Sequence, residues 1–449
     1  MSPDHVKAEV LVIGAGAAGL AAARALHEAG VDIIVVEARD RPGGRIWTRR
    51  ETGTLPIELG AEFIHGRAAE FDDVLEAASL TRLDIGGRRF RAGTRQLRPL
   101  DDFWERLDRV MRRLDGRARR DRSFQDFLDD KPGGRRLAAD RHLARQYVEG
   151  FHGADPRLIS ARVLAESGSP GDDTHERRLG RIIDGYDRVI EWLAAPFADR
   201  IRFCSPVTAV RWEPGGVSAT ITDAAADKQR SLAARAAIIT VPVGVLQGSK
   251  DSSGPIRFVP ALRQKQEALS KLASGSAIRV VLQLKNRFWS SDEFAKQHRA
   301  EELETMSFIH GTDTDFPTWW TTYPALAPLL VGWCGGPRAR ELSSLNTHEI
   351  LERAIDALAR QLRLQRRRLH GLVTGAWTHD WENDPYARGV YSYQVVGGRL
   401  ASAALARPIR RTLFFAGEAT DTDGATGTVH GAIATGRRAA AQIMRALDL

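Results

Sequence analysis

The sequence predicts an α/β fold in which one domain is built from separate segments of the chain and an α+β domain is inserted between them. At 449 residues the chain is too long for a single hydrophobic core. Strand and helix patterns alternate over residues 1–65 and return at 413–447, whereas the residues between them change from a helical to a strand period near position 201. A pattern that begins at one end and returns at the other predicts a sheet completed by the C-terminal segment.

The N-terminal segment carries the parts of a Rossmann-like dinucleotide-binding unit. Gly14, Gly16 and Gly19 follow a short apolar strand, an alanine-rich helix comes next, and a second strand ends at Glu37. In such units the first glycine permits a tight turn, the second lets the backbone approach a pyrophosphate, and the third lets the helix lie close to the strand. The free N–H groups of the helix attract phosphates, and the acid accepts hydrogen bonds from a ribose. We therefore predict that this segment binds a dinucleotide.

Composition limits the location and the chemistry of the protein. With 43% hydrophobic and 27% charged residues, the chain is typical of a globular protein. No apolar run approaches the ~20 residues of a membrane helix, and residues 1–8 lack the apolar stretch of a signal peptide. The two cysteines, Cys204 and Cys334, are too far apart for a disulfide framework or a metal site. We expect a cytoplasmic protein without membrane contact and without a metal.

The net charge of +8 comes largely from an arginine-rich section, residues 87–146. Either these arginines form an anion- or nucleic-acid-binding surface, or they lie on solvated helix faces. Acidic residues are interleaved with them, as at Asp101-Asp102 and Asp129-Asp130, and no aromatic stacking pattern accompanies them. Interleaved charge favours solvated faces, so nucleic acid is not expected as a partner.

The middle of the chain divides into a helical and a strand-rich section. Residues 67–200 are expected to be mostly helical, because apolar residues recur there at helical spacing. Strands are expected from position 201 onward, where apolar residues alternate or run continuously between turn signals. The expected helices cover 103–114, 138–151, 186–197, 261–273 and 347–362. The expected strands cover 201–204, 207–212, 217–222, 236–241, 276–284, 308–309, 319–323 and 329–333.

The end of the chain repeats the strand, loop and helix order of its beginning. A strand at 413–416 is followed by a glycine-bearing loop from Gly417 to Gly427 and a long helix at 429–447. We therefore predict a discontinuous dinucleotide-binding domain and an inserted substrate-binding domain with a helical subdomain. The first comprises 1–80, 200–262 and 386–449, and the second comprises 81–199 and 263–385.

Five ordered segments resemble signatures of the flavin-containing amine oxidase family, which includes monoamine and polyamine oxidases. The GGR of residues 43–45 follows the acid that ends the second strand, as in the family's second signature. ELGAEFIHG at 58–66 is similar to the family's ELGAxWxxG, and TVPVGVL at 240–246 is similar to its TVPLGVL. FAGEAT at 415–420 and GTVHGA at 427–432 resemble its C-terminal flavin-binding part. The resemblance extends over nearly the whole chain.

The resemblance implies FAD as the cofactor, because a nicotinamide enzyme has no use for the GGR segment or the C-terminal part. Arg45 would then offer a fixed cation to the pyrophosphate, and Glu418 would hydrogen-bond the ribitol or pyrophosphate region. The main chain at Val207 would hold the adenine edge. Val429 would open a helix whose N-terminus faces the flavin pyrimidine carbonyl. The cofactor-binding residues implied are Gly14, Gly16, Gly19, Glu37, Ala38, Arg39, Gly44, Arg45, Leu59, Gly60, Ala61, Glu62, Val207, Trp381, Gly417, Glu418, Thr428 and Val429.

The resemblance also implies the reaction. In the family, a neutral amine, here of polyamine or related type, loses a hydride to the flavin, the imine hydrolyses, and molecular oxygen reoxidises the flavin to give hydrogen peroxide. Trp381 and Tyr391 match aromatic positions beside the flavin, where Tyr391 would be one wall of a cage that aligns the amine. His65 matches a position at the active-site mouth, where it would contact the substrate amine or set its protonation, or it is a loop histidine without a catalytic role. The direction of Glu62, on the same segment, is not fixed by the sequence.

Three positions depart from the family pattern. Arg279 stands where the family has a lysine that holds a water against the flavin, so Arg279 either slows oxygen activation or binds a substrate carboxylate. Thr428 stands where monoamine-type members have the second cage tyrosine. Val390 stands where animal monoamine oxidases have the cysteine that bonds the flavin, so we expect non-covalent FAD.

Some alternatives stay open at this point. Phe316, Trp319, Trp320 and Trp333 either line a substrate cleft or pack in the core. A desaturase, isomerase or amino-acid oxidase acting on a carboxylated substrate would use the same fold, with Arg279 in support. A low-turnover, FAD-bound scaffold is a third hypothesis, supported by the arginine-rich section. The sequence does not predict an oligomeric state.

Overall fold

The computed structural model describes most of the chain. The described ranges are 5–51, 53–66, 69–93, 96–167, 178–223, 228–248, 256–312 and 315–448. Residues 1–4 of the N-terminal segment and 168–177 of the expected helical section therefore lie outside the described residues.

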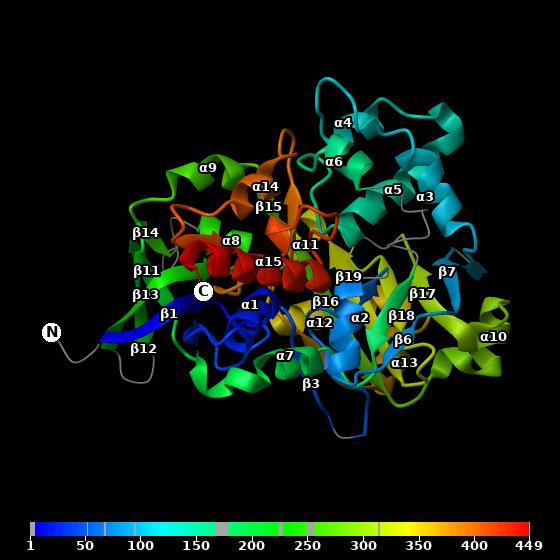
Figure 1. Cartoon of the computed structure of the whole chain (residues 1–449). Helices are drawn as coiled ribbons and strands as arrows, with labels where there is room; N and C mark the ends of the chain where they lie inside the picture. The colour runs from blue at the N-terminus through cyan, green and yellow to red at the C-terminus, as the bar shows by residue number, and fades with distance from the viewer. Residues whose placement is uncertain are drawn as a thin grey trace.

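A mixed eight-stranded sheet is assembled from distant parts of the chain (Figure 1). Its order is β10 (Ile201–Arg202), β2 (Ile33–Val36), β1 (His5–Ile13), β13 (Lys228–Ile239), β12 (Gly216–Asp223), β11 (Val207–Glu213) and β14 (Arg257–Val259). The C-terminal strand β22 (Leu413–Phe415) pairs in parallel with β13, placing Leu413 opposite Ala237. The predicted completion of this sheet by the C-terminal segment is confirmed.

The central strand β1 is buried on both faces of the sheet. Val10 and Val12 pack into one core with helices α1 (Ala17–Glu28), α7 (Asp187–Ala194) and α15 (Val429–Leu447). Leu11 and Ile13 pack into a second core on the opposite face. A continuous apolar run is what a parallel strand covered on both sides requires.

Helices α1 and α15 bring the two ends of the chain together, and Figure 1 shows them adjacent. A Cβ placed on Gly436 of α15 would lie 2.2 Å from the carbonyl oxygen of Ala18 in α1, so glycine allows this close approach. Because α15 starts at Val429, as the sequence predicts, its N-terminus lies on the same side of the molecule as the glycine turn before α1.

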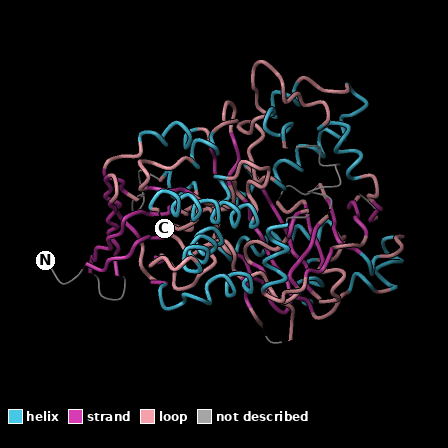
Figure 2. Tube along the Cα trace, viewed as in Figure 1, coloured by secondary structure: helices cyan, strands magenta, loops and turns pink. Residues whose placement is uncertain are grey.

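A seven-stranded sheet forms the second layered part of the molecule, and Figure 2 shows the strands gathered in two separate regions. Its order is β20 (Val373–Thr378), β16 (Ala277–Leu284), β19 (Leu329–Gly335), β18 (Thr318–Thr321), β17 (Met306–His310), β7 (Arg88–Ala92) and β8 (Leu97–Pro99). Helix α12 (Thr347–Gln361) packs its apolar face into the core beneath this sheet. Asn346 begins that helix with a capping box, in which its side chain accepts from the Glu349 N–H and the Glu349 side chain accepts in return.

The remaining elements surround these sheets. Helices α3 (Phe103–Met111), α4 (Phe124–Asp129), α5 (Ala138–Phe151) and α6 (Ala161–Glu166) share a core of their own at the upper right of Figure 1. The other helices are α2 (Ala69–Ala77), α8 (Val243–Gln247), α9 (Arg263–Ser270), α10 (Asp292–His298), α11 (Pro337–Leu342), α13 (Arg366–Leu372) and α14 (Ala401–Ala406). Small sheets join β3 (Thr48–Arg49) to β4 (Ile57–Glu58), β5 (Ile64–His65) and β6 (Arg82–Asp84) to β9 (Leu179–Ile182), and β15 (Leu272–Ser274) to β21 (Ser392–Gln394).

The structure differs from the sequence expectations in the section 67–200. Four short strands, β6 to β9, interrupt the expected helices, and two of them join the seven-stranded sheet. Their sequences, such as RRFRA at 88–92, carry too few apolar residues to show a strand period. Helix α7 packs with α1 rather than with α3 to α6. The domain boundaries stay a prediction, and this packing would move the boundary at 199 back to about 182.

None of the described helices is both long enough and apolar enough to cross a membrane.

Candidate active site

One cavity of about 1750 Å³ joins the glycine turn of the first sheet to an aromatic chamber beside the second sheet. Pockets for single small ligands typically measure about 300–1,000 Å³, so this cavity has room for a dinucleotide as well as a substrate. Every residue that the sequence assigns to the site lines it, except Gly19. The cavity therefore brings together segments that are hundreds of residues apart in the chain.

The glycine turn is shaped as a dinucleotide site requires. A Cβ on Gly16 would meet nothing within 4 Å, so the space in front of this residue is open. A Cβ on Gly19 would lie 1.9 Å from the Gly14 carbonyl oxygen and 2.9 Å from Oγ1 of Thr240. Gly19 therefore allows close packing behind the turn, whereas Gly16 keeps space in front of it. Gly16 caps α1 without a side-chain hydrogen bond, which leaves backbone N–H groups for a phosphate.

Glu37, directly after β2, lies beside this turn and contacts its backbone. One carboxylate oxygen accepts a hydrogen bond from the Ala15 N–H at 2.8 Å and the other accepts from the Arg39 N–H at 2.9 Å. Burial raises the pKa of Glu37, and these two N–H donors oppose the rise. Both oxygens keep further lone pairs, which are available to the hydroxyl groups of a ribose.

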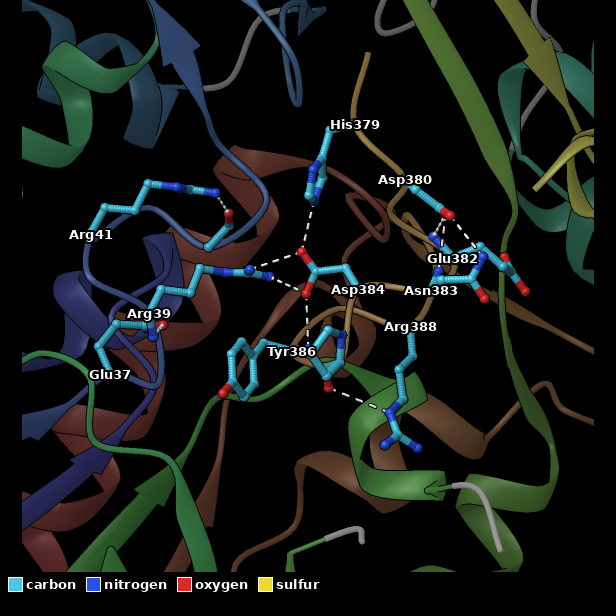
Figure 3. A network of polar contacts seen from close by, with 12 residues as sticks. Glu37, Arg39, Arg41, His379, Asp380, Glu382, Asn383, Asp384, Tyr386 and Arg388 are labelled. Atoms are coloured by element: carbon cyan, nitrogen blue, oxygen red, sulfur yellow. Dashed lines mark hydrogen bonds and ion pairs between the residues drawn. The ribbon is translucent and has the colours of Figure 1, made fainter. Parts of the chain in front are cut away.

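Arg39 ties the dinucleotide-binding unit to the loop that follows β20. Its guanidinium donates two hydrogen bonds of 2.8 Å to the two carboxylate oxygens of Asp384, which also contacts Nε2 of His379 at 2.7 Å (Figure 3). Burial alone would raise the pKa of Asp384, but the hydrogen bonds from His379 and Arg39 hold it well below its ordinary value. A bidentate pair of this kind fixes the geometry of both partners. Arg39 thereby positions the loop that carries Trp381 and Tyr391.

A second ion pair connects the GGR segment to the C-terminal segment. Nη1 of Arg45 donates to Glu418 at 3.1 Å and also to the carbonyl oxygen of Val390. Glu418 in turn accepts from the hydroxyl of Ser392 at 2.7 Å. Arg45 and Glu418 both line the cavity, as the resemblance implies, and each orients the other there.

The segment after β4 supports the wall of the cavity. Nε1 of Trp381 donates to the carbonyl oxygen of Leu59 at 2.9 Å, and a Cβ on Gly60 would lie 1.9 Å from the Arg45 carbonyl oxygen. The backbone of Leu59, Gly60 and Ala61 therefore lies tightly between Arg45 and Trp381. Ala38, Gly44 and Val207 line the same cavity.

The C-terminal segment presents a helix N-terminus to the cavity. Oγ1 of Thr428 accepts from the Gly431 N–H at 3.0 Å and thus caps α15, which starts at Val429. Gly417, Thr428 and Val429 all line the cavity. The positive end of a 19-residue helix therefore borders the cavity.

The aromatic chamber is built around Tyr391, Phe151 and His65. The hydroxyl of Tyr391 donates to the Phe151 carbonyl oxygen at 2.7 Å, which fixes the plane of the tyrosine ring. His65 meets the Phe151 ring edge-on at 5.3 Å, and its Nδ1 is buried with no hydrogen-bond partner in the described part of the chain. Burial and the nearby His430 lower the pKa of His65 to about 4, so the imidazole is neutral at pH 7. A neutral imidazole with a free nitrogen can accept a hydrogen bond from an amine.

Glu62 points into this region and is held between two arginines. It accepts from Nη2 of Arg279 and from Nε of Arg181, the latter at 2.5 Å, and Nε1 of Trp320 donates to it at 3.0 Å. Burial alone would raise the pKa of Glu62, but the charges of Arg279 and Arg181 lower it. Arg279 also donates to the Gly60 carbonyl oxygen at 3.3 Å. The sequence left the direction of Glu62 open, and the structure pairs it with Arg279.

The tryptophan-rich strands divide between the core and the cavity. Phe316 and Trp319 are fully buried in the core beneath the sheet. Trp320 and Trp333 line the cavity, with their rings 6.0 Å apart. Successive residues of a strand point to opposite faces, so Trp319 packs in the core while Trp320 faces the cavity.

Three functional candidates could not be found from the sequence. Arg181 reaches Glu62 from β9, a strand that the helical pattern of its section concealed. Arg89 and His310 line the far end of the chamber, on β7 and β17. Nothing distinguishes Arg89 in a run of arginines, because its environment depends on the pairing of strands distant in sequence.

The buried histidines predict a pH dependence of stability. Burial lowers the pKa of His152 to about 4, from an ordinary value of 6.5, and it lowers the pKa of His65 and His310 as well. Between pH 6.5 and 4 the unfolded chain takes up protons that the folded chain does not, so the free energy of unfolding falls as the pH falls through this window. His152→Asn removes one such group and should flatten this fall. Urea unfolding at pH 7 and pH 5 measures it, and an unchanged pH slope in the variant would contradict the assignment.

Comparisons with known proteins agree with this geometry. The sequence profile of the family described as flavin containing amine oxidoreductase matches residues 17–444. Polyamine oxidase 2 from Arabidopsis thaliana is 29% identical over 470 residues, covering 98% of this chain and 89% of its own length.

Solved structures show the same fold. Wild-type putrescine oxidase bound to putrescine is similar with a TM-score of 0.80 and 21% identity, covering 98% of this chain and 100% of that one. Cyclohexylamine oxidase from Brevibacterium oxydans IH-35A is similar with a TM-score of 0.77 and 23% identity, covering 100% of both chains. The predicted fold class, a discontinuous Rossmann-like domain with an inserted α+β domain, is confirmed. The chain belongs to the flavin-containing amine oxidoreductase family and is an oxidoreductase of the amine oxidase type.

Proposed function

We propose that this protein is an FAD-dependent oxidase that converts a small amine to an imine, with molecular oxygen as the electron acceptor and hydrogen peroxide as a product. The observation that carries the proposal is the continuous cavity from the glycine turn to the aromatic chamber. One end of it suits a dinucleotide and the other suits an apolar amine. The family resemblance supplies the chemistry that joins them.

The residues of the cavity fit non-covalent FAD. The open space before Gly16 and the uncapped start of α1 suit a pyrophosphate, and Glu37 suits a ribose. Arg45 and Glu418 suit the ribitol and pyrophosphate region of the cofactor. Neither Cys204 nor Cys334 is among the described residues that line the cavity, which supports a cofactor held without a cysteine bond.

When bound, FAD would supply the acceptor for the hydride. The protein has to hold the amine unprotonated, align it and exclude water. Tyr391, fixed by its hydrogen bond to Phe151, provides a rigid aromatic wall. Neutral His65 can accept a hydrogen bond from the amine nitrogen. The apolar and aromatic lining of the chamber disfavours a charged ammonium, so it favours the neutral form of the amine.

Arg279 would take the place of the family lysine that holds a water against the flavin, but with a guanidinium in place of an ammonium group. Its guanidinium is oriented by Glu62 and by the Gly60 carbonyl oxygen, so its position is fixed and its charge is balanced by Glu62. Arginine lacks the compact ammonium of lysine, and slower reoxidation by oxygen stays a prediction. The same pairing weakens the hypothesis that Arg279 binds a substrate carboxylate.

The substrate class and the location of the protein follow from the resemblance and the sequence. The relatives are named for polyamines and putrescine, and a polyamine or related amine is the substrate class that the resemblance implies. A cytoplasmic location stays a prediction. Several arginines of the charged section pair with acids, as Arg106 and Arg109 do with Asp140, which supports a solvated face rather than a nucleic-acid site.

Turnover in air tests the proposed function. We expect purified protein to consume oxygen when an amine is added and to form hydrogen peroxide and a carbonyl product in equal amounts. Boiled protein and protein stripped of flavin serve as controls. Flavin-bound protein that yields no peroxide with monoamines, diamines or amino acids would favour the scaffold hypothesis instead.

A further inference from the structure

At the end of the chamber away from the glycine turn lies a cation that the proposed reaction does not use. Arg89 is on β7, paired in register with Phe308 of β17, and it lines the cavity. Its Cζ lies 4.5 Å from the centre of the Phe308 ring, 5.1 Å from that of Phe103 and 5.3 Å from that of Trp104. Aromatic faces on several sides hold the guanidinium in place and keep water from it.

No carboxylate in the described part of the chain balances the charge of Arg89. Among the residues that the structure describes, no acidic side chain forms an ion pair with it, whereas Arg279, which lines the same cavity, is paired with Glu62. Burial lowers the pKa of Arg89 to about 10, so the group is still charged at pH 7. A buried charge without a partner destabilises a protein, so an anion that enters the cavity would be bound strongly there.

A second polar group faces the same place. His310 stacks on the Phe103 ring at 4.8 Å, and its Nε2 is buried with no hydrogen-bond partner in the described part of the chain. Arg89 contacts the same Phe103 ring, and its charge lowers the pKa of His310, so the two side chains are neighbours. A fork of guanidinium donors beside an imidazole nitrogen is a set that suits the two oxygens of a carboxylate.

The separation of this pair from the amine-binding end limits the ligand. His65 lies 6.3 Å from Phe63, which lies 6.2 Å from Phe308, the ring that Arg89 covers. Two aromatic rings thus stand between the amine-binding end and Arg89. Glu62, which also lines the cavity, is already engaged by two arginines and offers little to a second ammonium group.

We propose that Arg89 and His310 bind the carboxylate of the substrate, and that the substrate is an amine whose carboxylate lies several bonds from its amino group rather than a polyamine. This proposal rests on the proposed oxidase function and specifies its substrate class. A diamine would bring its second ammonium toward Arg89 and be repelled. An α-amino acid would be too short to reach both ends.

Three substrates of equal chain length test the proposal. Anaerobic flavin reduction is compared for 6-aminohexanoate, hexylamine and 1,6-diaminohexane, and for the analogous sets with four and eight carbons. We expect the aminocarboxylate to exceed the diamine by about 10- to 100-fold, at the best length, in the rate constant of flavin reduction divided by the Kd of the substrate, as charged hydrogen bonds typically allow. Arg89→Met should remove this advantage and leave the alkylamine within about threefold of wild type.

The control is Arg91→Met, which replaces an exposed arginine on the same strand and should leave all three substrates unchanged. Arg89→Met should also leave the unfolding midpoint of the ligand-free holoenzyme unchanged or raise it, since it removes an unbalanced buried charge. If the diamine is the best substrate, or if Arg89→Met slows all three equally, the proposal is wrong.

Binding without turnover separates this proposal from the oxidase function. Calorimetric titration of the holoenzyme with hexanoate should show binding in wild type and in Arg91→Met, but not in Arg89→Met. If no amine reduces the flavin while hexanoate binding depends on Arg89, the oxidase function fails and the carboxylate site stands. Absence of hexanoate, butanoate and octanoate binding to wild type would overturn the site itself.

Discussion

Replacing Glu62 with glutamine is expected to destabilise the protein by about 3–5 kcal/mol, the usual result of removing one partner from a buried ion pair. Glu62 is 8% exposed and balances Arg279 and Arg181, which are 5% and 9% exposed. An amide would leave both guanidinium groups buried with too little opposing charge. Urea unfolding followed by circular dichroism measures this loss of stability as a shift of the unfolding midpoint.

Glu58 offers a matched control four residues earlier. Burial raises its pKa to about 8, so this carboxyl is mostly protonated at pH 7, in contrast to Glu62. One of its oxygens accepts from the Tyr186 N–H at 2.8 Å and the other from the Thr48 hydroxyl at 2.7 Å. In glutamine the amide oxygen could keep the first bond, and the amide N–H could donate to the Thr48 oxygen in place of the second. Glu58→Gln should therefore cost less than about 1 kcal/mol, as expected for a neutral group replaced by one of similar shape.

A double variant separates charge balance from packing. In Glu62→Gln with Arg279→Met, the charge that lost its partner is removed as well, so the combined loss should be smaller than the sum of the two single losses. Equal damage from Glu62→Gln and Glu58→Gln would show that Glu62 does not act as a buried counter-charge. Additive losses in the double variant would lead to the same conclusion.

Substituting alanine for Gly19 or Gly16 should have two different effects. A Cβ on Gly19 collides with the Gly14 carbonyl oxygen at 1.9 Å, so the turn has to move. We expect a loss of about 1–3 kcal/mol in stability, typical of overpacking, together with loss of FAD binding. A Cβ on Gly16 meets no atom of the described residues within 4 Å, so Gly16→Ala should fold as stably as wild type without cofactor.

Gly16→Ala nevertheless should bind FAD at least about tenfold more weakly, a loss of 1.4 kcal/mol or more, if a pyrophosphate occupies the space in front of it. Flavin fluorescence titration of the stripped proteins measures this affinity, and the unfolding midpoint of the same samples serves as the folding control. Wild-type affinity for FAD in Gly16→Ala would place the pyrophosphate elsewhere.

The N-terminal unit and the last helix were the parts of the fold that local sequence pattern determines best. The glycine spacing, the apolar run before it and the start at Val429 are all local signals, and the structure has β1, α1 and α15 where they indicate. The strands β6 to β9 were missed because they are short and rich in arginine, and long-range pairing rather than local periodicity stabilises them.

The candidate site likewise contains residues that local motifs predict and residues that only the folded chain brings together. Residues near the glycine turn and in the C-terminal loop follow from motifs, and they line the cavity as expected. The pairing of Glu62 with Arg279 and Arg181 depends on three elements that meet only in the folded chain, so no spacing could indicate it. Arg89 and His310 are likewise recognised only from their surroundings, because each is an ordinary residue type in an ordinary strand.

Anaerobic mixing of the purified, FAD-loaded protein with amines is the most direct test of the central claim, that one cavity holds a flavin and presents an amine to it. We predict that the yellow flavin absorbance bleaches as the amine is oxidised and returns when oxygen is admitted, with formation of hydrogen peroxide. A protein that does not take up FAD, or whose bound flavin stays oxidised with monoamines, diamines and aminocarboxylates alike, would contradict the claim.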